Sequence, residues 1–196
     1  MQPLAMLRSS PAMRGLAIAS LIYSGVQLCF IAFMTVHLTS KAGFDLIGAG
    51  RALAAYQIAG VVSRPIWGWL ADNVLAARWL LALQGAIMCG AALLAARFGP
   101  GWDGGLVILV CACAGATASG FTGIAYGEYA RLGGEQRTEA TGLGAASMFG
   151  GVMVLPSLMS LAVTASGSYL IAYSAIGVLA LLSGASLAFQ PARPAR

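Results

Sequence analysis

Charged side chains are scarce in this chain of 196 residues, in which Asp, Glu, Lys and Arg together make up only 9%. Soluble domains carry roughly a quarter of charged residues. Because 59% of the residues are hydrophobic, the chain lacks the polar side chains that would cover a globular surface in water. The net charge of +5 comes mainly from arginines that lie between long apolar runs. This arrangement indicates a protein oriented in a lipid bilayer, and it argues against a nucleic-acid-binding protein.

Groups that commonly perform catalysis are also missing. Histidine occurs once, as His37 near the end of the first apolar run, so there is neither an HExxH zinc site nor a histidine-based triad in the core. We interpret His37 as an interfacial residue. The sequence has no GxxxxGK[ST] phosphate-binding loop, and its four cysteines lie in apolar runs without CxxC spacing, as expected of buried thiols. We therefore expect no enzyme, no metal and no cofactor.

Long apolar stretches are what the sequence does contain. A helix needs about 20 mainly apolar residues to cross a bilayer, and six stretches approach that length. Their short connections leave no room for a soluble domain, so we expect residues 1–196 to form a single all-α integral membrane domain. The six predicted spans are approximately 15–38, 47–71, 79–97, 105–127, 140–164 and 169–189.

The basic residues predict the orientation of these spans. An even number of spans places both termini on one side of the membrane, and the other side would hold only Lys41, Arg51 and Arg97. Since basic residues concentrate in cytoplasmic loops, we expect both termini in the cytoplasm, with the protein spanning a plasma or inner membrane. The residues on the expected cytoplasmic side are Arg8, Arg14, Arg78, Arg131, Arg137, Arg193 and Arg196.

A few polar and aromatic side chains fall inside the predicted spans. An amide has four hydrogen-bonding sites, and leaving them unmet in hydrocarbon costs several kcal/mol. We predict that Tyr23, Gln27, Tyr56 and Gln57 line the path of a small-molecule substrate. The alternative is hydrogen bonding between helices, which we favour for the serines and threonines. The spans contain no Asp or Glu at mid-depth that would carry a proton.

Small residues at steps of four occur in the fourth and fifth spans. Helices in lipid associate through close backbone approach, so such residues are expected at helix contacts. A proline farther along the fifth span, Pro156, predicts a kink or a local break. The expected packing positions are Gly123, Gly127, Gly142, Ala146 and Gly150.

The stretch SRPIWGWLADN, residues 63–73, ends the second span with two opposite charges. Gly60, Arg64, Gly68 and Asp72 follow one another at steps of four and so share one face of a helix. The two tryptophans of this stretch are expected to anchor the helix at the bilayer interface. The glycines on the shared face predict a close contact with another helix.

At this stretch the sequence resembles the major facilitator superfamily of secondary transporters. GWLADNVLAARWLL is similar to the loop signature G-x-L-A-D-R-x-G-R-R/K, which joins the second and third helices of each six-helix half. Asn73 stands where the first Arg is usual, and Arg78 is the only basic residue left in the loop. The upstream SRPIWG resembles the run that precedes the second-half copy of the signature. The matching positions are Gly68, Leu70, Ala71 and Asp72.

This resemblance covers nearly the whole chain, from about Arg14 to Gln190, and implies the C-terminal six-helix half of a transporter, built from 3+3 inverted repeats. A complete transporter has twelve helices, so the implied partner is a second copy in a homodimer or a separate N-terminal six-helix half. The implied function is transport of a small organic solute by alternating access. The alternative is a truncated or accessory membrane subunit without transport activity. A small channel is a third option, but no filter-like segment supports it.

The resemblance also implies gating roles. In the family, the carboxylate of the signature lies against the N-terminus of a helix in the opposite half, where the helix dipole favours an anion. Asp72 would take this role here. The predicted gating residues are Gly60, Arg64, Gly68, Asp72 and Arg78.

Overall fold

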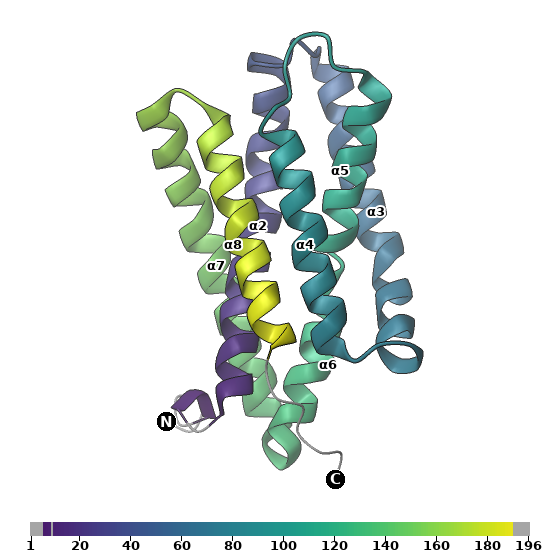
Figure 1. Ribbon diagram of the computed structural model, residues 1–196, viewed down its shortest axis with the longest axis vertical. Coiled ribbons are helices and arrows are strands. Elements are labelled where there is room, and N and C mark those ends of the chain that lie inside the picture. Colours follow the sequence, from purple (N-terminus) through teal and green to yellow (C-terminus); the bar gives the residue numbers. More distant parts are fainter. Residues whose placement is uncertain (1–5, 9, 190–196) are drawn as a thin grey trace.

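The computed structural model describes residues 6–8 and 10–189, whose regular structure is helical throughout (Figure 1). This confirms the expected all-α fold. Arg193 and Arg196, which entered the orientation argument, lie outside the described residues. The helices are α2 (Pro11–Ser40), α3 (Leu46–Asn73), α4 (Ala77–Ala95), α5 (Gly104–Ala118), α6 (Phe121–Gly133), α7 (Arg137–Ser166) and α8 (Tyr169–Ala188), with the short 3-10 helix η1 (Gly134–Gln136) before α7.

Five described segments are long and apolar enough to cross a membrane. The fourth, Gly104–Ser166, contains α5, α6, η1 and α7, and the chain reverses direction between α6 and α7 (Figure 1). This segment therefore accounts for two crossings and the other four segments for one each, which agrees with the six predicted. The start of α2 and the end of α8 lie at the same end of the bundle (Figure 1). Which side of the membrane this end faces stays a prediction.

Several helices begin at polar residues that cap them. Ser10, Asp45 and Asp103 each accept a hydrogen bond from a backbone amide in the first turn of α2, α3 and α5, and Ser168 does so for α8. Such side chains satisfy amides that have no partner within the helix. In the bundle, α2 packs on α7 and α8, α4 packs on α8, and α3 packs on α5 (Figure 1).

The fourth predicted span, 105–127, is not one continuous helix. It is divided at Ser119 and Gly120 into α5 and α6, and α6 continues to Gly133, into the stretch expected to be a loop. The sequence marks this break only by a single glycine. By contrast, α7 runs through Pro156 as one helix, so the local break considered there is not present.

Hydrogen bonds between helices account for several of the polar residues within the spans. The Tyr23 hydroxyl donates to the carbonyl of Leu81, at 2.7 Å, and joins α2 to α4. The Ser24 hydroxyl lies 2.8 Å from the carbonyl of Met148, which joins α2 to α7. These are the interhelical bonds that we favoured for serine, and Tyr23 makes the same kind of bond.

We expect Tyr23→Phe to lower the free energy of unfolding by about 0.5–1.5 kcal/mol, because it removes one buried interhelical hydrogen bond and keeps the ring. The measurement is equilibrium unfolding in mixed detergent micelles. Tyr126→Phe is the matched control, since Tyr126 lies at the surface of α6. Equal stability of the two variants would contradict a stabilising role for the Tyr23 hydrogen bond.

The glycines that allow close helix contact differ from the predicted ones. A Cβ atom at Gly25 would lie 2.7 Å from Leu155 Cβ, one at Gly144 would lie 2.6 Å from the Tyr129 ring, and Gly151 lies against the backbone of Leu21. In contrast, Gly142 and Ala146 are exposed and Gly150 is only partly buried. The predicted steps of four therefore selected the wrong face of α7 for contact within this chain, because both faces of a membrane helix are apolar. Gly123 and Gly127 of α6 also have open space around them.

His37 is buried within the bundle, with 3% of its surface exposed, so its ring packs against protein; its depth in the membrane stays a prediction. Its Nε2 lies 3.0 Å from the carbonyl of Ala95, and its ring packs at a centroid distance of 4.3 Å against Tyr169. The ring thus links the ends of α2 and α4 to the start of α8. The expectation of buried cysteines holds for three of the four, whereas Cys113 is exposed on α5.

Candidate functional site

One face of α3 exposes polar side chains along an otherwise apolar helix. Gln57, Arg64 and Asp72 are exposed on this face, while their neighbours Ile58 and Val61 are 64% and 65% exposed. Polar groups of this kind are costly to present to lipid, so they are expected to face protein or water. We call Gln57, Arg64, Gly68 and Asp72 the polar face of α3.

The break between α5 and α6 lies against this helix. The carbonyl of Ala116, in the last turn of α5, accepts hydrogen bonds from Ser63 Oγ at 2.8 Å and from Trp67 Nε1 at 2.7 Å. The carbonyl of Ser119 accepts one from Arg64 Nε at 3.2 Å. The last carbonyls of a helix have no partner within it, and here side chains of α3 supply the donors.

Among the described residues, Arg64 has a hydrogen-bond partner at Nε and none at its terminal nitrogens. Its Nε hydrogen bond to Ser119 fixes the plane of the guanidinium, and the side chain remains exposed. A guanidinium presents its donors as a rigid fork that matches planar oxygen anions. Arg64 lies nine residues before Asn73 at the end of α3, which corresponds to about 14 Å along the helix. Arg64 therefore presents its terminal nitrogens at the surface of α3, and its predicted gating role stays a prediction.

The predicted substrate-lining residues occupy two different environments. Tyr23 and Tyr56 are fully buried between helices, and the Tyr56 hydroxyl donates to the carbonyl of Gln27 at 3.3 Å. Gln27 is partly buried, whereas Gln57 is exposed on the polar face of α3, about 10 Å along the helix from Arg64. Contact of these four residues with substrate stays a prediction, and Gln57 is the one that shares a face with Arg64.

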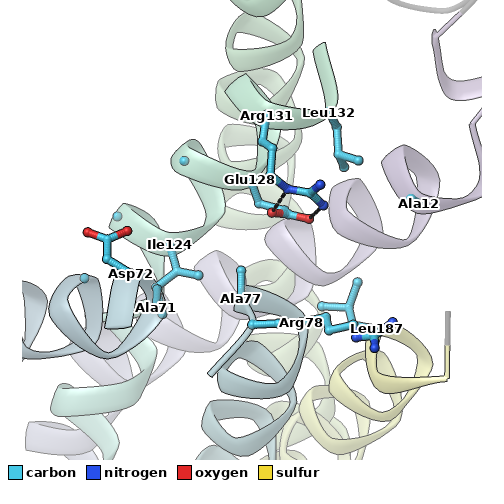
Figure 2. Close-up of a pocket in the computed structure, with 14 residues that line it drawn as sticks. Ala12, Ala71, Asp72, Ala77, Arg78, Ile124, Glu128, Arg131, Leu132 and Leu187 are labelled. Atoms are coloured by element: carbon cyan, nitrogen blue, oxygen red, sulfur yellow. Dashed lines mark hydrogen bonds and ion pairs between the residues drawn. The ribbon is translucent and has the colours of Figure 1, made fainter. Parts of the chain in front are cut away.

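A cavity of about 620 Å³ lies at the end of the bundle where α2 begins and α8 ends (Figure 2). Residues of α3, α4 and α6 form most of its wall, and Ala12 and Leu187 contribute from α2 and α8. Half of the lining residues are glycine or alanine, whose small side chains leave the cavity wide. The residues lining it are Ala12, Gly68, Ala71, Asp72, Ala76, Ala77, Arg78, Gly123, Ile124, Gly127, Glu128, Arg131, Leu132 and Leu187.

The cavity is surrounded by charges of both signs (Figure 2). Arg131 binds Glu128 through two hydrogen bonds, of 2.8 and 2.5 Å, and this carboxylate is largely buried. The guanidinium of Arg78 lies over the ring of Trp79, 5.5 Å from its centroid. Asp72 forms no ion pair within the described residues. The cavity therefore has one carboxylate available to a group from outside.

The structure brings together residues that the sequence had assigned separate roles. Gly68, Asp72 and Arg78 of the loop signature line the same cavity as Gly123 and Gly127. The last two were expected to pack against a helix, but they face this space instead. Gly60 is buried against Ser119 one turn from Arg64, as its predicted close contact required.

Sequence reasoning missed the bonds of two residues at the site and the burial of a third residue elsewhere in the bundle. Ser63 was not selected, and Trp67 was expected to be an interfacial anchor, with no sign that it would bond to α5. Their common partner is a backbone carbonyl, for which a side-chain pattern gives no signal. Gln84 of α4 is also fully buried, and its amide has no hydrogen-bond partner among the described residues.

Comparison with known proteins gives matches of two kinds. The chain is 31% identical over 109 residues to the probable nitrate/nitrite transporter NarK2 of Mycobacterium tuberculosis, in strains CDC 1551 and H37Rv, and the match covers 52% of this chain and 27% of the relative. The crystal structure of the E. coli fucose:proton symporter FucP superposes with a TM-score of 0.77 at 15% identity, covering 97% of this chain and 45% of the symporter. No protein-family model matches. The chain thus spans less than half the length of the proteins it resembles.

Proposed function

We propose that this chain, an integral membrane protein that resembles the major facilitator superfamily in sequence and in fold, forms one half of a transporter for a small oxoanion of the nitrate or nitrite type. The resemblance is to transporters and not to an enzyme. Transport would proceed by alternating access between two six-helix halves. The inorganic anion replaces the organic solute expected from the sequence, because the relative in sequence is named for nitrate and nitrite.

The exposed guanidinium of Arg64 carries this proposal. It is a permanent cation on a membrane helix, fixed at Nε by Ser119 and with no ion pair among the described residues. A cation in such a position is stable only when an anion or water solvates it. A planar oxoanion can accept two parallel hydrogen bonds from the terminal nitrogens of a guanidinium. Gln57 on the same face offers an amide donor to the same solute path.

The polar face of α3 also supports the presence of a second six-helix unit in the proposed transporter. It would face lipid in an isolated six-helix unit, so the proposed transporter covers it with another six-helix unit. That unit is either a second copy of this chain or a separate N-terminal half. In the competing proposal, an accessory subunit without transport activity, the same face would bind a protein and no solute.

Reconstitution of the purified chain in liposomes tests the proposal. We expect it to bind nitrate in equilibrium dialysis, with competition by nitrite, and to catalyse nitrate counterflow if it forms a dimer. Light scattering in detergent gives the oligomeric state. Binding without counterflow would support the anion site and assign the second half to another chain. A chain that neither binds nor moves either anion would overturn the proposal and favour the accessory subunit.

We expect Asp72→Asn to lower counterflow by about tenfold while leaving membrane insertion and nitrate binding unchanged. The substitution removes the negative charge that Asp72 presents to the cavity, where the proposed partner is the N-terminus of a helix in the other half. Asp103→Asn is the control, because Asp103 caps α5 at the opposite end of the bundle. Unchanged counterflow in the Asp72 variant would exclude the gating role.

A further inference from the structure

The break between α5 and α6 is held by three donors from a single stretch of α3. Ser63 and Trp67, one helical turn apart, both donate to the carbonyl of Ala116, and Arg64 between them donates to the carbonyl of Ser119. In a continuous helix the carbonyl of residue 116 would instead accept the amide of residue 120. Two side chains thus occupy the acceptor that would otherwise join α5 to α6.

The contact is tightly packed on both sides. A Cβ atom at Gly120 would lie 2.6 Å from Trp67 Cδ1 and 2.9 Å from Ser63 Oγ. One at Gly60 would lie 2.7 Å from Ser119 Cβ. There is little space in which the end of α5 can shift relative to α3. The carbonyl of Ser119 is therefore fixed in position relative to Arg64.

We propose that Ser63 and Trp67 are positioning residues for anion binding. By holding the carbonyl of Ala116 they keep the helix broken, and the break directs the carbonyl of Ser119 to Arg64 Nε. This orients the two terminal nitrogens of Arg64 toward the solute. The inference rests on the proposed function in one respect, namely that Arg64 binds the anion.

The mechanism predicts what happens when the two donors are lost. The carbonyl of Ala116 becomes free to accept the amide of Gly120, and the helix can close its hydrogen-bond ladder across the break. Ser119 then becomes part of one continuous helix, and its carbonyl accepts a backbone amide of that helix. Arg64 loses its fixed partner and samples several rotamers, so it binds the anion less tightly.

Four single variants and one double variant test this inference. Trp67→Phe removes the N–H group and keeps most of the ring, and Ser63→Ala removes only the hydroxyl. Trp69→Phe is the control for the first, since Trp69 is 60% exposed on the same helix. Ser157→Ala is the control for the second, because the Ser157 hydroxyl donates to the carbonyl of Met153 within α7 and to no other helix that the structure describes. Each variant is assayed for its nitrate Kd and, without nitrate, for amide hydrogen exchange at residues 117–123.

We expect the nitrate Kd to rise about three- to tenfold in Trp67→Phe and Ser63→Ala, which is the effect of one hydrogen bond, and further in the double variant. Exchange at Gly120 should slow as the ladder closes, a change that a general loss of stability would not produce. The controls should match the wild type. Unchanged exchange together with an unchanged Kd would overturn the inference.

The two readouts separate this inference from the proposed function. If the wild type binds no anion, the proposed function fails, and anion positioning fails with it. Slower exchange in the variants would then still support the conclusion that the hydrogen bonds of Ser63 and Trp67 keep α5 and α6 separate. If the wild type binds nitrate and the variants alter neither measurement, only the positioning role fails.

Discussion

Arg64→Ala is expected to weaken nitrate binding by at least about 100-fold. Two hydrogen bonds from a charged donor are lost together, each worth about 1.5–3 kcal/mol, and a factor of ten in Kd corresponds to about 1.4 kcal/mol. Equilibrium dialysis with labelled nitrate measures the effect. No other substitution proposed for this chain removes the whole cation from the polar face of α3.

Two further substitutions make this result specific. Arg64→Lys keeps the charge but has neither the fork nor the Nε donor to Ser119, so we expect about a tenfold loss of affinity. Arg51→Ala removes an exposed arginine near the start of the same helix and should leave the Kd unchanged. Equal losses in the Arg51 and Arg64 variants would indicate a general effect of net charge and would contradict a site at Arg64.

Gly151→Leu is expected to prevent stable folding or to lower the free energy of unfolding by about 3 kcal/mol or more. Gly151 lies against the backbone of Leu21, and its Cβ would also lie 2.7 Å from Ser24 Oγ. The backbone of α2 cannot move aside without separating from α7, and overpacking in a well-packed interior typically costs about 1–3 kcal/mol or more. Equilibrium unfolding in mixed micelles, together with the yield of folded protein, gives the magnitude.

Gly142→Leu is the matched control on the same helix. Space around Gly142 is open, so its substitution should change stability by no more than about 0.5 kcal/mol. A large loss in the Gly142 variant and none in the Gly151 variant would restore the packing face expected from the steps of four in the sequence. That outcome would place the contact on the face that is exposed in the structure.

The sequence allowed the loop signature to be located but not the full set of side chains around it. Gly68, Asp72 and Arg78 were identified from a pattern of consecutive residues, and they line one cavity. Glu128 was assigned no role from the sequence, yet it lines the same cavity, where it forms an ion pair with Arg131. The cavity lies between the adjacent helices α3 and α4 and the distant helix α6, with single residues from α2 and α8, so no local pattern could predict it.

Ser63 and Trp67 show the same limit more sharply. A tryptophan near the end of a membrane span usually indicates an interfacial anchor, and this prediction for Trp67 gave no sign of a bond between helices. Its indole bonds to the carbonyl of Ala116, which belongs to another helix. Every residue has a backbone carbonyl, so the sequence gives no signal for which carbonyl accepts a hydrogen bond from a given side chain.

The sequence by itself determined the solvent, the fold class and the number of crossings, because the transfer of a helix into lipid depends on the summed apolarity of about 20 consecutive residues. Only the tertiary structure decided which glycines pack, where α5 ends, and that His37 is buried. In water the polar side of a helix marks its outer face, but in lipid both the packed and the exposed sides are apolar. The choice between them is made by the shape of the neighbouring helix, as at Gly151 and Leu21, and that information is not local to either segment.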